Sequence, residues 1–153
     1  RLMPMVYPME ILQTPVQVTI LAEWEGQIRR IFPAGRPHPQ DPDPTYNGHS
    51  IGRWDGETLL VDTIGILGGG IINDHGAPLG EQVHVTEKWW AEGPDTLKNE
   101  ITVDSPDALL RPIKAVKTFK RRTDIQIMEY ICTQNNRNQT NADGVTGIEL
   151  KKR

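Results

Sequence analysis

The stretch GHSIGRWDGETLLVDT, from Gly48 to Thr63, constrains the fold of this chain more than any other. It contains two strand-forming runs on either side of Asp55-Gly56, and the first of them ends at Trp54. Asp-Gly between two β-prone runs is a strong hairpin signal, because glycine tolerates the positive φ angle that a tight hairpin turn requires. The stretch therefore predicts a β-hairpin near the centre of the chain.

Further strand-forming runs lie on both sides of this hairpin, and turn signals separate them. The expected strands are Met9–Gln13, Val16–Trp24, Gln27–Phe32, Val83–Trp90, Thr96–Val103, Ile113–Arg121 and Ile125–Cys132. No segment shows a convincing 3.6-residue apolar stripe with helix caps, and only Asp104–Leu110 offers a single helical turn. About eight or nine short strands in hairpin order predict an all-β protein. Its simplest form is a single antiparallel β-barrel of about eight strands, calycin-like or lipocalin-like.

Two long loops flank the central hairpin. Pro33–Asn47 is rich in proline, which fixes φ and donates no hydrogen bond to a sheet, and Ile64–Gln82 contains three consecutive glycines. Long loops without secondary structure usually line or cover a site, so we expect residues 33–50 and 64–82 to form a lid. We expect residues 1–135 to form the barrel domain. Residues 136–153 are polar and are expected to form a loosely ordered tail.

Composition and charge exclude several classes of partner. The chain has 153 residues, of which 37% are apolar and 24% charged, as is usual for one globular domain. The net charge of −3 provides no basic face for nucleic acid. No apolar run approaches the roughly 20 residues needed to cross a bilayer. We therefore expect neither a nucleic-acid partner nor a membrane span.

Strand alternation places charged and polar groups on apolar faces. Successive side chains of a strand point to opposite faces, so each strand can be divided into two sets. In five strands, one polar group falls on an otherwise apolar face: Arg30, Glu87, Asn99, Lys117 and Glu129. A buried ionised group must be paired, neutralised or hydrated. Two interpretations stay open: internal ion pairs that stabilise the barrel, or a polar patch that orients a small, partly apolar ligand in a cavity.

Two of these carboxylates, Glu87 and Glu129, are candidates for acid–base chemistry. If they share one cavity, desolvation and mutual repulsion raise at least one pKa. A carboxyl group whose pKa lies near neutrality can serve as a general acid or base. Among the histidines, His49 is the best candidate, because it opens a strand at the expected barrel mouth.

Three further residues complete the candidate ligand site. Trp54 and Trp89 lie in or near strands, where they serve either core packing or an apolar ligand wall. Asp62 is ambiguous, because neither face of its strand is clearly the inner one. The sequence lacks HxH and HExxH spacing, a phosphate-binding glycine motif and a nucleophile elbow. We therefore expect neither a metal nor a cofactor.

The segment GRPHPQDPDPTYNGHSIGRWDGETLLVDT (Gly35–Thr63), with QTP at Gln13–Pro15 and MEYIC at Met128–Cys132, resembles a family of exported bacterial β-rich proteins. The resemblance covers most of residues 1–135 and implies a secreted or periplasmic location. Relatives generally carry further sequence upstream, often with a cysteine, which implies that Arg1 is an internal start and leaves the state of Cys132 open. The family has no established activity, so no functional residue carries over.

Three functions follow from these observations. The favoured hypothesis is a small-molecule-binding β-barrel with a polar patch inside an apolar cavity. The alternative is an acid–base enzyme, a lyase, isomerase or hydrolase, that uses Glu87 or Glu129 together with His49. The third hypothesis is a structural subunit. Such a subunit would form a homo-oligomer, or it would dock onto another chain through its long loops and a missing upstream segment.

Overall fold

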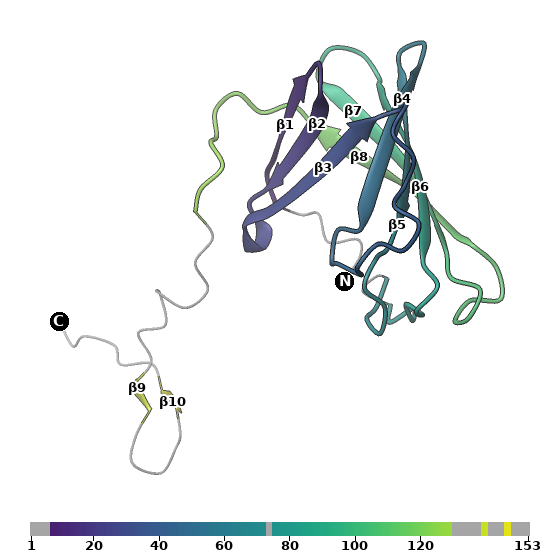
Figure 1. The fold of residues 1–153 in the computed structure, drawn as a ribbon. Helices are drawn as coiled ribbons and strands as arrows, with labels where there is room; N and C mark the ends of the chain where they lie inside the picture. The colour runs from purple at the N-terminus through teal and green to yellow at the C-terminus, as the bar shows by residue number, and fades with distance from the viewer. Residues whose placement is uncertain (1–6, 73–74, 130–138, 141–145, 148–153) are drawn as a thin grey trace.

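A computed structural model describes residues 7–72, 75–129, 139–140 and 146–147. Eight strands form one sheet that follows the order of the chain and curls into a half-barrel (Figure 1). They are β1 (Met9–Thr14), β2 (Gln17–Ala22), β3 (Gln27–Pro33), β4 (His49–Asp55), β5 (Thr58–Ile64), β6 (His84–Ala91), β7 (Thr96–Asp104) and β8 (Ile113–Lys120). The expected all-β class with about eight strands is confirmed.

The central hairpin is confirmed, with its turn one residue later than expected. Strands β4 and β5 pair in antiparallel register up to Asp55 opposite Thr58. The two turn residues are therefore Gly56 and Glu57. Gly56 has φ of 58°, which is the left-handed conformation that this turn requires of its first residue.

One pair of strands departs from the antiparallel barrel that the sequence predicts. Strands β3 and β4 are parallel, with Ile31 opposite Ser50. A parallel pair needs a connection of a dozen or more residues, and the proline-rich loop 34–48 provides it. The loop is tied to the neighbouring strands by backbone hydrogen bonds from Ala34 N to Gly52 O, at 2.8 Å, and from Thr45 N to Gly65 O, at 3.0 Å.

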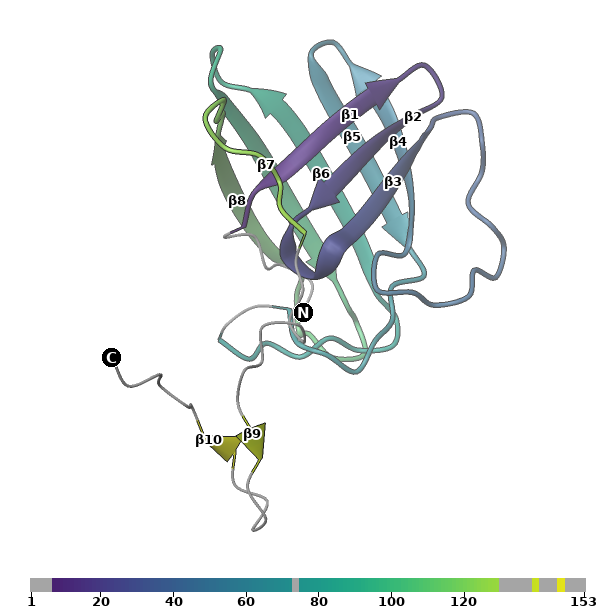
Figure 2. The same ribbon diagram turned by 90° about the vertical axis from the view of Figure 1, so that its left-hand side faces the viewer.

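The inner face of the sheet carries two apolar clusters. The first consists of Ile66, Ile72, Leu79, Val83, Val85, Ile101 and Val103. The second consists of Val18, Ile20, Ile31, Leu59, Val61 and Trp89. Three members of the first cluster, Ile66, Ile72 and Leu79, come from the glycine-rich loop 65–82, which lies across one end of the strands (Figure 2). This loop therefore closes one end of the half-barrel.

The two edges of the sheet, β1 and β8, stay separate. Among the described residues, no ladder of hydrogen bonds joins these strands. Met9 of β1 and Phe119 of β8 nevertheless pack against the same apolar cluster. The seam is therefore held by side chains rather than by backbone pairing, and the structure is a half-barrel rather than a closed barrel.

The end of the chain departs from the sequence-based prediction. The expected strand Ile125–Cys132 is wrong over residues 125–129, which form no strand, while residues 130–132 lie outside the described residues. The Arg122 guanidinium donates to Asp124 at 2.7 and 2.6 Å and holds a local turn directly after β8. Beyond it, the backbone N–H of Met128 donates to Glu23 Oε2 at 3.2 Å, so this segment lies against the link between β2 and β3 and forms no strand.

Only part of the expected tail can be compared with the structure. Two short strands, β9 (Gln139–Thr140) and β10 (Thr146–Gly147), pair with each other in antiparallel register. The remainder of residues 136–153 lies outside the described residues. Within the part of the chain that the structure describes, no helix is long and apolar enough to cross a membrane.

Candidate functional site

A row of polar side chains crosses the inner face of the sheet between the two apolar clusters. Each of six consecutive strands contributes one member: Arg29 from β3, Ser50 from β4, Thr63 from β5, Glu87 from β6, Asn99 from β7 and Lys117 from β8. Strand β6 illustrates the pattern, because Glu87 lies between the buried residues Val85 and Trp89 on the same face. We call these six residues the polar row.

Arg29 is the centre of a hydrogen-bond network in the polar row. Its guanidinium donates to Ser50 Oγ at 3.1 and 3.2 Å and to Thr63 Oγ1 at 3.0 Å. It also forms an ion pair with Glu87 Oε2. The other oxygen of that carboxylate, Oε1, accepts a hydrogen bond from Asn99 Nδ2 at 2.9 Å. Both oxygens of Glu87 therefore have partners, although the residue is only 3% exposed.

The network keeps Glu87 ionised. Burial acts to raise the pKa of Glu87, but the charge and hydrogen bond of Arg29 outweigh it, helped by Asn99 and Lys117, so that the pKa is lowered. This is the opposite of the expected rise, because the near partner of Glu87 is a guanidinium and not a second carboxylate. Glu87 is therefore unsuited to donate or take up a proton near neutral pH.

Lys117 and Asn99 each keep one polar group without a partner. Within the described residues, the Lys117 ammonium makes no hydrogen bond or ion pair, and Asn99 Oδ1 has no donor. Burial lowers the pKa of Lys117, whereas the charge of Glu87 acts to raise it and that of Arg29 to lower it. Asn99 is only 2% exposed, so water offers little compensation to this oxygen. In these two groups the described residues leave hydrogen-bonding capacity unused.

The polar row, apart from the fully buried Ser50, forms the floor of a cavity of about 430 Å³ in the half-barrel. Apolar walls come from both the strands and the glycine-rich loop: Ile66, Leu67, Leu79, Val85 and Ile101. Tyr46 and Asn47, at the end of loop 34–48, and Trp24, between β2 and β3, also line it. The glycine-rich loop thus contributes to the enclosure as expected, but only the last part of the proline-rich loop does.

Three of the residues expected to orient a ligand lie together in the cavity, whereas the prediction for Arg30 is wrong. Glu87, Asn99 and Lys117 are neighbours on adjacent strands, as the alternation predicted. Arg30, in contrast, is exposed on the outer face, and its neighbour Arg29 points inward. Strand β3 carries apolar side chains on both faces, so the alternation of its sequence did not show which face is the inner one.

The remaining candidates do not join this site. Glu129 is exposed and lies outside the sheet, so it shares no cavity with Glu87. Trp54 is 52% exposed near the tip of the central hairpin. Trp89 is 5% exposed and stacks on Phe119, with ring centroids 5.6 Å apart, within the second apolar cluster. Neither tryptophan is among the residues that line the 430 Å³ cavity.

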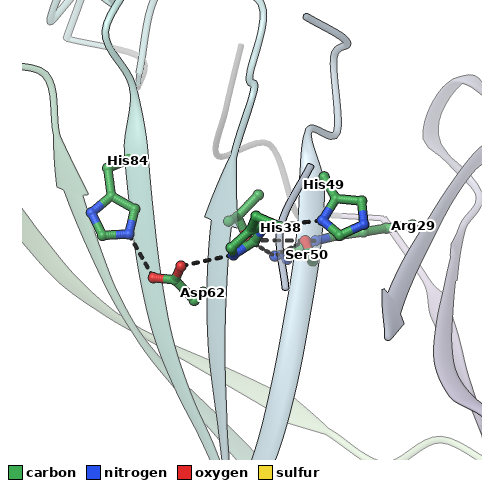
Figure 3. A network of polar contacts seen from close by, with 7 residues as sticks. Arg29, His38, His49, Ser50, Asp62 and His84 are labelled. Carbon is green, nitrogen blue, oxygen red and sulfur yellow. Dashed lines mark hydrogen bonds and ion pairs between the residues drawn. The ribbon is translucent and has the colours of Figure 1, made fainter. Parts of the chain in front are cut away.

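His49 and Asp62 belong to a second polar network, on the outer face of the sheet (Figure 3). His38, from loop 34–48, lies between them: its Nδ1 is 2.9 Å from His49 Nδ1 and its Nε2 is 2.9 Å from Asp62 Oδ2. His84 Nε2 approaches Asp62 Oδ1 at 2.5 Å. Sequence patterns missed His38 and His84, because only the strand register and the path of the loop bring them to Asp62.

This outer network fixes the proline-rich loop rather than forming an evident reaction centre. His49 stacks on Phe32 with ring centroids 5.3 Å apart, and Arg36 lies over the same phenyl ring. Within residues 7–72 and 75–129, no group of three or more His, Cys, Asp or Glu side chains is placed to hold a metal ion. His49 and Glu87 lie on opposite faces of the sheet, so they do not converge as an acid–base pair.

The contact between His38 and His49 makes stability depend on pH. It needs one donor and one acceptor, so the two rings cannot both be fully protonated while it persists. Burial, and secondly the charge of His38, lower the pKa of His49 below its ordinary 6.5. The unfolded chain therefore binds the proton first as pH falls. We expect the free energy of unfolding to decrease as the pH falls from about 6.5 to the lowered pKa of His49.

Urea unfolding at a series of pH values tests this expectation. His49→Gln removes the titrating ring and is expected to flatten the decrease below pH 6.5. An unchanged pH dependence in this variant would show that the decrease has another source.

Comparisons with known proteins supply no relative from which a function could be transferred. No family model matches the chain, and neither a curated protein nor a solved structure matches it. The functional argument therefore rests on the side chains described above.

Proposed function

We propose that this protein binds a small, partly apolar molecule in the cavity of the half-barrel. The observation that carries the proposal is the polar row on the floor of a cavity with mainly apolar walls, in which Asn99 Oδ1 has no donor and Lys117 makes no hydrogen bond or ion pair among the described residues. The volume of about 430 Å³ lies in the range of small-molecule sites, which combine apolar walls with a few convergent polar groups.

Internal ion pairing accounts for only part of the polar row. Arg29 and Glu87 form a buried pair whose hydrogen bonds are satisfied by Ser50, Thr63 and Asn99, and this pair needs no ligand. Lys117 makes no hydrogen bond or ion pair among the described residues, and only the charge of Glu87 acts to stabilise its ammonium group. A bound molecule that uses Lys117 and Asn99 would offset the cost of burying them.

The fold supports the same proposal at a coarser level. A single sheet in chain order, curled around an interior site, is the arrangement by which lipocalin-like, or calycin-like, barrels hold one small ligand. We propose this kind of binding for the half-barrel. A secreted or periplasmic location remains an expectation from the sequence resemblance alone. The enzyme alternative is not favoured, because Glu87, Glu129 and His49 do not meet.

Binding of a neutral fluorescent probe, N-phenylnaphthylamine, tests the proposed function. Its emission rises when it leaves water for an apolar cavity. Because the probe is uncharged, its binding does not depend on the Lys117 ammonium. We expect saturable binding to the wild-type chain. Leu67→Trp places a larger side chain in the cavity wall and is expected to weaken probe binding about tenfold or more, because it removes space that the probe needs.

Leu110→Trp is the matched control, because Leu110 is fully exposed and is not part of the cavity wall. This variant is expected to bind the probe as the wild type does. Absence of saturable binding to the wild type would refute the proposed function. Equal binding by both tryptophan variants would show that the probe binds elsewhere.

A further inference from the structure

The charges that face the cavity do not balance. Arg29 and Glu87 neutralise each other, so the Lys117 ammonium leaves one positive charge beside apolar walls. Glu25 is the other acidic residue lining the cavity, and it is exposed. An anionic group on the ligand would supply the missing negative charge in the interior, where an opposite charge has most effect.

The surroundings of Lys117 favour a group with a single negative charge. Dianionic phosphate is usually bound by several backbone N–H groups or by free arginines. Here the one arginine of the cavity is engaged by Glu87, Ser50 and Thr63. The Glu87 carboxylate also repels a second negative charge nearby. A carboxylate therefore matches Lys117 better than a phosphate does.

The orientation of the Asn99 amide specifies a second polar group on the ligand. A carboxylate only accepts hydrogen bonds, so the amide nitrogen must face Glu87, and Oδ1 is fixed as the unpaired acceptor. Asn99 lies directly opposite Lys117 in the register of β7 and β8. A hydroxyl group next to the ligand carboxylate would donate to Asn99 Oδ1 while the carboxylate accepts from Lys117.

We infer that the cavity binds an aliphatic hydroxy acid, with its carboxylate at Lys117, its hydroxyl at Asn99 and its chain along the apolar walls. This inference rests on the proposed function, since it names the class of ligand for the same cavity. The walls formed by Leu67, Leu79 and Ile101 are aliphatic and suit an alkyl chain.

Displacement of N-phenylnaphthylamine by three ligands of equal chain length tests the inference: octanol, octanoate and α-hydroxyoctanoate at pH 7. We expect octanoate to bind about tenfold or more tightly than octanol, because only the carboxylate forms a charge-assisted hydrogen bond with Lys117. We expect α-hydroxyoctanoate to bind more tightly than octanoate, because its hydroxyl satisfies Asn99 Oδ1.

Lys117→Met keeps an unbranched side chain that is one atom shorter but removes its charge, and it is expected to lower octanoate binding to the level of octanol. Octanol binding is expected to persist in this variant, which also shows that the variant is folded. Lys117→Arg is expected to retain part of the preference for octanoate, because it keeps the positive charge.

The outcomes separate the inference from the proposed function. If the probe binds and octanol competes as well as octanoate, the carboxylate inference is overturned and the proposed function stands. A preference for octanoate that survives in Lys117→Met overturns the assignment to Lys117. Equal binding of octanoate and α-hydroxyoctanoate overturns the role of Asn99. If neither the probe nor any of the three ligands binds, the proposed function itself fails.

Discussion

Replacing Glu87 by glutamine is expected to destabilise the folded protein by about 3 to 5 kcal/mol, because it removes one partner of a buried ion pair. Glutamine has the shape of glutamate, so the effect isolates the charge. The Arg29 guanidinium would remain in the interior without its counter-ion, among Ser50 and Thr63, whose hydroxyl groups carry no compensating charge. Urea unfolding at pH 7 measures the loss as a difference in the free energy of unfolding.

Glu100→Gln provides the matched control. Glu100 pairs with Lys88 at 3.2 Å on the outer face, where both side chains are partly exposed, and such a pair contributes about 0 to 1 kcal/mol. Replacing Arg29 and Glu87 together by methionine is expected to recover much of the loss, because apolar groups need no counter-ion. A Glu87→Gln variant no less stable than Glu100→Gln would contradict the buried pair.

The ion pair between Arg29 and Glu87 also makes the stability of the protein depend on pH in the acidic range. Because the pKa of Glu87 is lowered from 4.5 in the folded state, its contribution to stability is complete above pH 4.5. The contribution decreases as pH falls through the lowered pKa, since the unfolded chain takes up the proton first. Glu87→Gln is therefore expected to lose less stability than the wild type below pH 4.5.

The strands that could be predicted from the sequence are those with one clearly apolar face. In β6, β7 and β8 the apolar residues recur at every second position, and a single polar group interrupts each series. This is why Glu87, Asn99 and Lys117 were found from the sequence. The alternation fails for β3, because Phe32 is apolar yet lies on the outer face, where His49 covers it. The cover that His49 of β4 and Arg36 of loop 34–48 provide for Phe32 thus reversed the assignment of Arg29 and Arg30.

Other features depend on contacts between residues that are distant in the sequence. Ser50 and Thr63 are common hydroxyl residues, and only their convergence on Arg29 makes them part of the site. Strands β3 and β4 are parallel, but loop 34–48 is long enough to join them in either direction, so turn signals could not decide their relative direction. The apolar alternation at residues 125–129 was misleading, because these residues pair with neither open edge of the sheet.

The two tryptophans proposed for the ligand wall differ in the effect expected on their removal. Trp89→Ala is expected to destabilise the protein by about 3 to 5 kcal/mol, because it leaves a void in the second apolar cluster and removes the stack on Phe119. Trp54→Ala is expected to change stability by no more than about 0.5 kcal/mol, because Trp54 is 52% exposed. Urea unfolding of both variants measures the contrast, and similar losses would contradict the burial of Trp89.

Trp89→Phe separates packing from ligand binding. The indole Nε1 of Trp89 is buried and has no acceptor among the described residues, so phenylalanine keeps an aromatic stack while removing an unsatisfied donor. We therefore expect Trp89→Phe to cost much less stability than Trp89→Ala. Because Trp89 lies outside the wall of the 430 Å³ cavity, this variant is expected to bind N-phenylnaphthylamine as the wild type does. Loss of probe binding in a stable Trp89→Phe variant would place the ligand against the second apolar cluster. The polar row would then lie at the edge of the binding site rather than form its floor.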